Sequence, residues 1–357
     1  DMAGTILKVK LLTICMFVGI VFSALITFPM TTNAASQKSY KLKIPLGLDE
    51  EAFKVPQDNP MTKEKIELGR LLFFDKRLSA NNTIACASCH IPSLAFTDGQ
   101  PVSTGINNQQ GGRSAPTAIN RGFSKAQFWD GRAATLEDQS IGPFANLIEH
   151  GFTSHDELIK KINSIKGYKK LFSDIYGINK LTKENVGRAI ASFQRTLVSG
   201  NSPFDRFDYD GDQKAISESA KRGKKLFFDK ARCNLCHMGT NFSDEQFHNI
   251  GIGWDDSDTL DLGRYRVSKS EKDIGAFKTP TLREITKTAP YMHDGRFATL
   301  KDVIAHYNEG GIKNPFLDNQ IIPLKLSDSE KNDLIAMLRS LEGEGWQHVK
   351  VPTEFPQ

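Results

Sequence analysis

The motif Cys-x-x-Cys-His occurs twice in this chain, at positions 86–90 and 233–237. It is the attachment pattern of c-type haem, in which two cysteine sulfurs form thioethers and the following histidine reaches the iron. A single copy could also be a redox pair or part of a zinc site, and four cysteines in an exported chain could form two disulfides. Two copies that use four of the five cysteines favour two covalently bound haems. The residues that would hold them are Cys86, Cys89, His90, Cys233, Cys236 and His237.

The fifth cysteine, Cys15, lies in an apolar stretch near the N-terminus. Lys8 and Lys10 precede the apolar run 11–28, and small residues follow it. This order is typical of a secretory signal, so residues 1–35 are predicted to be a signal peptide that directs export to the periplasm. The alternative is an uncleaved membrane anchor, because 18 mostly apolar residues nearly span a bilayer. In both cases the rest of the chain is exported.

The two haem motifs belong to a longer internal repeat of four blocks in the same order. The paired blocks are 69–76 with 223–230, 86–90 with 233–237, 115–117 with 279–281, and 130–136 with 294–300. A period this long indicates duplication of a domain, since solenoid repeats have periods of about 20–50 residues. The sequence therefore predicts an N-terminal haem domain at 36–202 and a C-terminal haem domain at 203–357.

Helical patterns dominate between these blocks, and no alternating strand pattern persists. Apolar residues at helical spacing predict helices over 63–74, 154–177, 182–200, 217–228 and 327–343. The stretch 199–211 is rich in Gly, Asn, Pro and Asp and is predicted to be the linker. The predicted fold class is all-α. The net charge of +4, from 46 basic and 42 acidic residues, is too balanced to indicate a nucleic-acid partner.

The two repeats differ at the position that could bind iron opposite the histidine. Tyr307 lies 13 residues after Asp294 of the shared block, and the residue at the same distance from Asp130 is Pro143. A tyrosine oxygen can ligate ferric iron, whereas proline has no ligating side chain. The comparison favours one capped iron and one iron open to a small molecule. The alternative is that Tyr307 is a core tyrosine flanked by His306.

The chain resembles the bacterial di-haem cytochrome c peroxidase and MauG family. The resemblance rests on the haem motifs, on Gln-Phe-Trp-Asp-Gly-Arg at 127–132 and on Glu-Ile-Thr-Lys-Thr-Ala-Pro-Tyr-Met-His-Asp-Gly-Arg-Phe-Ala-Thr-Leu at 284–300. It extends from about residue 63 to residue 343. It implies two tandem cytochrome c-like domains, two covalently bound haems c, a calcium ion between the haems and an oxidoreductase of the cytochrome-c peroxidase type.

The resemblance also implies roles for individual residues. His90 would be the proximal ligand of the peroxide-reacting haem, and His237 that of the electron-transfer haem. Trp129 matches the position between the haems where an indole relays electrons. Glu149 matches the glutamate that handles protons during O–O cleavage, although it could also be a surface carboxylate. The remaining matches are Gln139 and Pro143 in the peroxide pocket, Tyr307 on the second iron, and Ser114, Thr288 and Pro290 as calcium ligands.

Several positions depart from the peroxidases of this family. The stretch 104–110 has no histidine, although many members carry one in the loop that closes the first haem. The first haem is therefore expected to be open even in the fully oxidised protein. Tyr307 stands where those peroxidases usually have methionine, as in MauG, and Met292 or His306 are the alternative ligands. Ala231 replaces a surface tryptophan of MauG, so oxidation of a protein partner would need another route.

Three functions follow as hypotheses. The first is an exported di-haem peroxidase that reduces hydrogen peroxide to water, with electrons from a small redox protein (a cytochrome c or cupredoxin) or a quinol-linked donor. The second is a MauG-like oxidase that uses peroxide to modify a protein or another substrate through a high-valent di-haem state. The third is a plain di-haem electron carrier. The chain could form a homodimer, and His248 is expected to bond a propionate or a backbone group.

Overall fold

The computed structural model describes residues 38–254 and 260–357, so the predicted signal peptide at 1–35 lies outside the described residues. Positions 36–357 form one compact unit. The helices are α1 (Lys63–Phe74), α2 (Cys86–Cys89), α3 (Leu136–Ile141), α4 (His155–Ser164), α5 (Lys166–Tyr176), α6 (Lys183–Gln194), α7 (Pro203–Tyr209), α8 (Glu218–Phe228), α9 (Tyr265–Ser268), α10 (Leu300–Glu309) and α11 (Asp328–Arg339). β1 (Phe247–His248) and β2 (Phe277–Lys278) pair antiparallel. The prediction of a helical protein is confirmed, with this small sheet as an addition.

The helix ends show where the local sequence controls the backbone. α1 and α8 begin where predicted, because the side chains of Thr62 and Ser217 cap their first turns. The predicted helix over 154–177 is wrong in one respect, since the extended backbone of Ile165 separates α4 from α5. The predicted linker at 199–211 contains α7. Ser202 and Asp205 form a capping box there, and proline occupies the first helical position.

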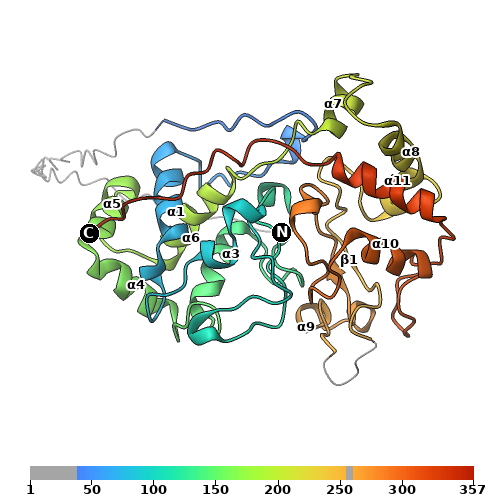
Figure 1. Ribbon diagram of the computed structural model, residues 1–357. Helices are drawn as coiled ribbons and strands as arrows, with labels where there is room; N and C mark the ends of the chain where they lie inside the picture. Colours follow the sequence, from blue (N-terminus) through green and yellow to red (C-terminus); the bar gives the residue numbers. More distant parts are fainter. Residues whose placement is uncertain (1–37, 255–259) are drawn as a thin grey trace, which may run out of the picture. The chain divides into compact units, whose positions relative to one another are not determined.

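Each repeat contains the same crossing of two helices, α1 with α6 and α8 with α11 (Figure 1). A glycine makes each crossing close. A Cβ atom added to Gly69 would lie 1.9 Å from the carbonyl oxygen of Ala189, and one added to Gly223 would lie 1.9 Å from that of Asp333. The shared blocks of the sequence therefore produce the same packing twice.

Two hydrophobic cores lie within the compact unit. The first includes Leu68, Phe73 and Ile190 from α1 and α6, and the second includes Phe227 and Met337 from α8 and α11. The first core also includes Trp346, from beyond α11, and the two predicted domains with their boundary at 202/203 stay a prediction. The described parts of the chain contain no helix with the length and apolar character needed to cross a membrane.

The two repeats exchange equivalent backbone hydrogen bonds. The amide of Ser114 donates to the carbonyl oxygen of His293 at 2.7 Å, and the amide of Lys278 donates to that of Trp129 at 2.8 Å. Ser114 and Lys278 each precede the 115–117 or 279–281 block, and Trp129 and His293 each precede an Asp-Gly-Arg sequence. The contact between the repeats is thus reciprocal, and it brings Trp129 and His293 into the same region.

Candidate functional site

Two large cavities, one at each motif histidine, are lined by the predicted site residues except Cys86. The His90 cavity contains about 1830 Å³ of non-protein space and the His237 cavity about 1780 Å³, part of each open to solvent. Trp129 lines both cavities, and its predicted place between two haems stays a prediction.

His90 and His237 are held in the same way. The Nδ1 atom of His90 lies 2.9 Å from the carbonyl oxygen of Phe96, and that of His237 lies 2.9 Å from the carbonyl oxygen of Phe242. A carbonyl only accepts, so Nδ1 carries the proton and Nε2 presents its lone pair. Burial lowers the pKa of both histidines, which favours the neutral form that binds metal. Each ring is thus prepared to ligate an iron through Nε2.

The four cysteines of the motifs are free thiols in the structure, which excludes the disulfide alternative. Burial raises the pKa of Cys86 and Cys233 to about 12 and that of Cys89 to about 11. These thiols stay protonated at neutral pH. Cys89, Cys233 and Cys236 line the cavities, in reach of a bound group.

The His90 cavity is also lined by Gln139, Pro143 and Glu149, the three residues predicted for the peroxide pocket. Burial raises the pKa of Glu149, and a hydrogen bond from Asn146 opposes this shift. The Nδ2 atom of Asn146 donates to Oε1 of Glu149 at 2.6 Å. Glu149 is therefore a partly desolvated, oriented carboxyl group that faces the cavity, and the surface alternative is wrong.

The segment 104–110 packs against the backbone beside Glu149. The amide of Ile106 lies 2.9 Å from the carbonyl oxygen of Ile148 and 3.1 Å from that of Glu149. A Cβ atom on Gly105 would lie 2.0 Å from the Ile148 carbonyl oxygen, so glycine permits this close approach. The segment contributes Gly105 to the cavity lining.

Tyr307 lines the His237 cavity, as does Met292, whereas His306 is absent from the lining. Nε2 of His306 is 2.9 Å from the carbonyl oxygen of Ile250. The structure therefore favours Tyr307 or Met292 over His306 as a ligand. Burial raises the pKa of the Tyr307 hydroxyl, so it is protonated unless a cation displaces the proton.

The cationic side chains of Arg121 and Lys278 show whether the cavities can hold the negatively charged propionates of haem. Nε and Nη2 of Arg121 are buried and have no hydrogen-bond partner among the described residues, and Arg121 lines both cavities. Lys278 also lines both, and it forms an ion pair with Glu245 at 3.2 Å. Burial lowers the pKa of Lys278 to about 8. Buried charges need partners, and the carboxylates of haem propionates have the matching charge. The cavities thus fit the group that the sequence motifs predict.

The predicted calcium ligands Ser114, Thr288 and Pro290 all line the His237 cavity. The carbonyl oxygen of Ser114 accepts a hydrogen bond of 2.9 Å from Nε1 of Trp129. The structure thus brings the three residues to one cavity wall, next to the indole that separates the cavities.

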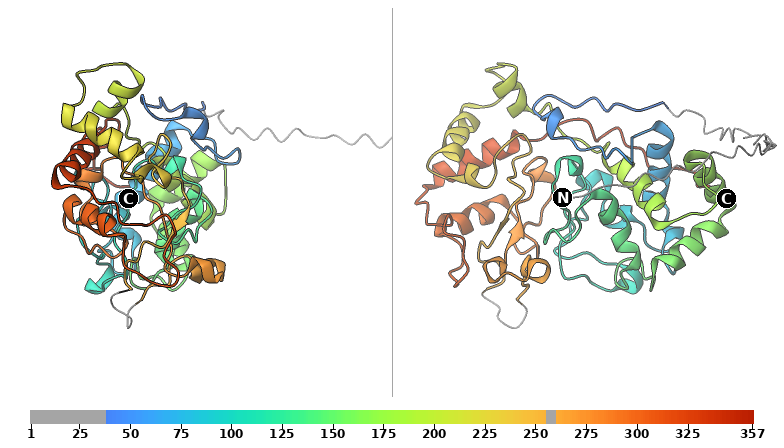
Figure 2. Two further views of the ribbon diagram at one scale, coloured as in Figure 1. Left: turned by 90° about the vertical axis from the view of Figure 1, so that its right-hand side faces the viewer. Right: turned by 180° about the vertical axis from the view of Figure 1, so that it is seen from behind.

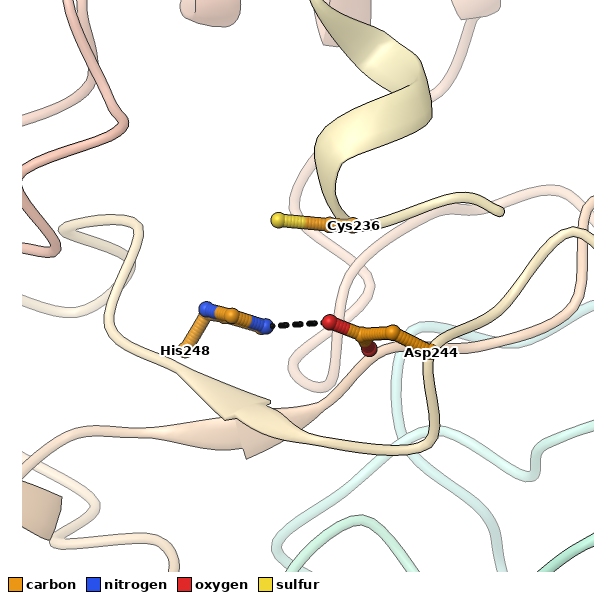
Figure 3. Close-up of side chains that lie close together, drawn as sticks. All are labelled: Cys236, Asp244 and His248. Atoms are coloured by element: carbon orange, nitrogen blue, oxygen red, sulfur yellow. Dashed lines mark hydrogen bonds and ion pairs between the residues drawn. The ribbon is translucent and has the colours of Figure 1, made fainter. Parts of the chain in front are cut away.

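Near the second haem motif, Cys236, Asp244 and His248 offer ligand atoms within 4.8 Å of one another (Figure 3). His248 bonds Asp244 at 2.9 Å through Nε2 and Asp318 at 2.6 Å through Nδ1. These two carboxylates help raise the pKa of His248 to about 11, and the expected bond to a propionate or a backbone group stays a prediction. If the Cys236 sulfur holds a haem, as the motif predicts, the His248 imidazole and its two carboxylates remain as support for this loop.

Sequence reasoning missed Asn146, Arg121 and Lys278. Asn146 and Arg121 belong to no shared block, so comparison of the repeats gives no signal for them. Lys278 aligns with Ser114, and this substitution of a lysine for a serine beside a shared block is a signal that could have been noticed.

The fold and the site together define a helical protein with two c-type haem sites, of which one has a carboxyl group and the other a tyrosine on its lining. Known proteins agree with this class. The sequence profile of di-haem cytochrome c peroxidases matches residues 63–214. The methylamine utilization protein MauG of Methylophilus methylotrophus is 41% identical over 297 residues, covering 82% of this chain and 87% of that protein.

Two further proteins extend the comparison. Cytochrome-c peroxidase IdrP1 of Pseudomonas sp. (strain SCT) is 36% identical, covering 80% of this chain and 83% of that protein. The crystal structure of a MauG-like protein associated with microbial copper homeostasis superposes with a TM-score of 0.76 at 32% identity, covering 86% of this chain and 95% of that one. The chain belongs to the di-haem cytochrome c peroxidase family, whose members are peroxide-using oxidoreductases.

Proposed function

We propose that the protein is an exported di-haem peroxidase that reduces hydrogen peroxide to water in the His90 cavity. One observation carries the proposal: Glu149 and Pro143 line the cavity of His90, whereas Tyr307 lines that of His237. A haem held by His90 would then meet Glu149 as an acid–base group and no second protein ligand from Pro143. A haem held by His237 would have Tyr307 as a further ligand, which suits electron transfer.

The two haem motifs would hold the cofactors. Thioethers would form through Cys86 and Cys89 in the first repeat and Cys233 and Cys236 in the second, with His90 and His237 as iron ligands. The iron of a bound haem supplies electron exchange with peroxide. Arg121 and Lys278 would neutralise the propionates, and Tyr307 would be the second protein ligand of the second iron.

Glu149 moves the protons in this scheme. Its carboxylate takes a proton from the bound peroxide and returns it to the departing oxygen, which general acid–base catalysis requires. Burial raises the pKa of Glu149, which brings it closer to the pH at which one group serves both steps. Asn146 fixes the carboxyl orientation through its 2.6 Å bond, and Gln139 and Pro143 shape the space beside it.

Electrons would reach the His90 cavity from the second haem through Trp129. The indole lines both cavities, and its bond to the Ser114 carbonyl fixes its plane. Leu235 and Met238 lie around the second haem motif with exposed fractions of 36% and 50%. Exposed apolar side chains at a redox centre suit a small donor protein such as a cytochrome c or cupredoxin. A quinol-linked donor would meet the same surface.

The proposal includes periplasmic export through residues 1–35, two domains that meet between positions 202 and 203, and one calcium ion. The calcium would be held by the Ser114 side chain and the carbonyl oxygens of Thr288 and Pro290. A homodimer would leave the two cavities of each chain complete, because all named site residues come from one chain.

A second candidate function is the oxidation of a protein or another substrate, the MauG-like chemistry that the family resemblance implies. Tyr307 in the His237 cavity favours it, because tyrosine lowers an iron's potential and methionine raises it. The stretch 104–110 lacks the histidine that would close the first site, which favours the same chemistry. Ala231 argues against oxidation of a protein partner by the route of MauG, because it stands where MauG has a surface tryptophan.

Peroxide turnover by the purified holoprotein tests the proposal. We expect rapid consumption of peroxide with reduced cytochrome c, cupredoxin or a quinol as donor, and loss of this activity in Glu149→Gln. Glu64→Gln, an exposed glutamate on α1, is the matched control. Oxidised product from a co-purified protein, without donor turnover, would favour the second candidate. A holoprotein that neither consumes peroxide nor changes its absorption spectrum would overturn both.

A further inference from the structure

The chain segments that follow α6 and α11 cross and pair with each other. The amide of Gly200 donates to the carbonyl oxygen of Glu344 at 3.1 Å, and the amide of Glu344 donates to that of Gly200 at 2.7 Å. Beyond this crossing, the segment after α11 runs back to α5, where the Gly167 amide bonds the carbonyl oxygen of Gln357 (Figure 1; Figure 2, right). Each segment therefore leaves its own repeat and packs against the other.

The crossing places one aromatic side chain at an equivalent position in each repeat. Phe204 packs against Phe242 with ring centroids 5.3 Å apart, and Trp346 packs against Phe96 with centroids 6.2 Å apart. Phe96 and Phe242 are the residues whose carbonyl oxygens hold His90 and His237 at 2.9 Å. Trp346 thus stands behind His90 where Phe204 stands behind His237.

The surroundings of Trp346 connect it to the protein surface. The side chain is 6% exposed and belongs to the first hydrophobic core. Nζ of Lys287 lies 5.6 Å from its ring centroid, and Lys287 pairs with Glu284 at 3.0 Å and Glu342 at 3.1 Å. The Lys287 side chain is 36% exposed. Only the Lys287 side chain therefore separates the indole from solvent on this side. Lys287, Glu284 and Glu342 together carry one positive and two negative charges.

Indole and phenyl differ sharply in redox chemistry. The electron-rich indole loses one electron far more readily than phenylalanine, so only the repeat that carries His90 has an oxidisable ring at this position. Nε1 of Trp346 is buried and has no hydrogen-bond partner among the described residues. An oxidised Trp346 would therefore keep its N–H proton, because no acceptor is in reach.

We propose that Trp346 is a redox-active residue on the His90 side of the first site. This inference rests on the proposed function, since the oxidant is hydrogen peroxide reduced in the His90 cavity. Reduction of one peroxide to two waters takes two electrons and two protons. Trp346 would supply one electron through the Phe96 and His90 contact, and the other would arrive through Trp129 from the donor side of the protein. The two protons would come from water through Glu149. The resulting indole cation radical takes its electron back from a reduced one-electron donor protein, a cytochrome c or cupredoxin, at the Lys287 surface, and a second donor molecule replaces the electron that passed through Trp129.

Trp346→Phe tests the proposal, since Phe204 shows that a phenyl group fits the equivalent position. The matched control is Trp254→Phe, because the indole nitrogen of Trp254 is likewise buried without a partner among the described residues. Each holoprotein would receive peroxide without a donor. Electron paramagnetic resonance of rapidly frozen samples would detect the radical, and mass spectrometry would locate oxidised tryptophan.

We expect a tryptophan radical in the wild type and in Trp254→Phe, and its loss in Trp346→Phe. Oxygenated product should accumulate at position 346 rather than 254. An unchanged radical in Trp346→Phe, with normal haem content and peroxide consumption, would overturn this inference and leave the proposed function intact. A wild type that fails to consume peroxide would instead overturn the proposed function.

Discussion

The two repeats hold their histidines identically but surround them differently. Both have a glycine at the helix crossing, and both fix the histidine ring with a phenylalanine carbonyl at 2.9 Å. Elsewhere in the cavity linings, the first site has Glu149 and the second has Tyr307. The duplicated residues thus build a haem site, and the residues outside the shared blocks determine what each site does.

The two repeats also differ in the rings that pack behind the histidines and in those that lie between the cavities. Trp346 and Phe204 occupy equivalent positions, as do Trp129 and His293. In both pairs the more readily oxidised ring is the tryptophan, which lines or backs the His90 cavity. The two repeats thus share a scaffold and differ in the oxidisable rings near their histidines, which is the difference that the proposed function assigns to oxidising chemistry. Four predictions follow, from the largest effect to the smallest.

Loss of a haem-attaching cysteine should produce the largest difference in activity between variants of the two repeats. Cys89→Ala should abolish peroxide turnover, because the first haem loses a thioether and its position in the His90 cavity. Cys236→Ala should impair donor turnover while the oxidised first site still reacts with peroxide. Haem content and stopped-flow absorption would measure both. Equal residual reactivity of the two variants toward peroxide would contradict the assignment of the peroxide site to the first repeat.

Glu149→Gln should lower the rate constant for reaction with peroxide by about 10²–10⁴-fold, the usual contribution of general acid–base catalysis. The amide has a similar shape but cannot carry the proton. Stopped-flow kinetics on the oxidised holoprotein would give this rate constant. Glu64→Gln should have the wild-type value, and a wild-type value for Glu149→Gln would remove the carboxyl group from the mechanism.

Asn146→Ala should lower the same rate constant by roughly tenfold, since a hydrogen bond to a charged group stabilises it by about 1.5–3 kcal/mol. The Asn146 bond lowers the pKa of Glu149, so its loss raises that pKa further. As the pH falls, the Glu149 carboxylate of the variant therefore becomes protonated at a higher pH than in the wild type, and it can then no longer accept the first proton. The acid limb of the pH–rate profile should therefore move to higher pH. A profile that keeps its wild-type position would show that Asn146 acts only on the loop structure.

Gly69→Ala and Gly223→Ala should each destabilise the protein by about 1–3 kcal/mol, as overpacking of a tight contact does. Both added Cβ atoms would lie 1.9 Å from a backbone oxygen of the partner helix. Urea unfolding would measure the effect. Gly112→Ala is the control, because its Cβ would meet nothing within 4 Å. A large loss in only one of the two variants would show that the crossings are not energetically equivalent.

Much of this arrangement could be predicted from the sequence. The repeat and the helical spacing predicted α1 and α8, and the alignment of the repeats predicted the contrast between Pro143 and Tyr307. The break at Ile165 was missed because the apolar spacing continues across it from α4 into α5. α7 was missed because its proline and aspartates resemble a linker, although Ser202 and Asp205 cap a helix.

The rest depends on contacts between residues far apart in the chain. Trp346 lies after α11, in the second repeat, and its position behind His90 follows from the crossing at Gly200 and Glu344. The unpaired guanidinium atoms of Arg121 have no sequence signal either, because burial and the lack of a partner are properties of the assembled fold. Composition and spacing describe local structure and do not determine such contacts.

The central claim is that the first iron has a free position and the second has Tyr307. Electron paramagnetic resonance of the fully oxidised holoprotein, with Tyr307→Phe measured beside it, tests this most directly. We predict one high-spin and one low-spin ferric haem in the wild type and two high-spin haems in Tyr307→Phe. Two low-spin haems in the wild type, or a low-spin signal unchanged in Tyr307→Phe, would contradict the account.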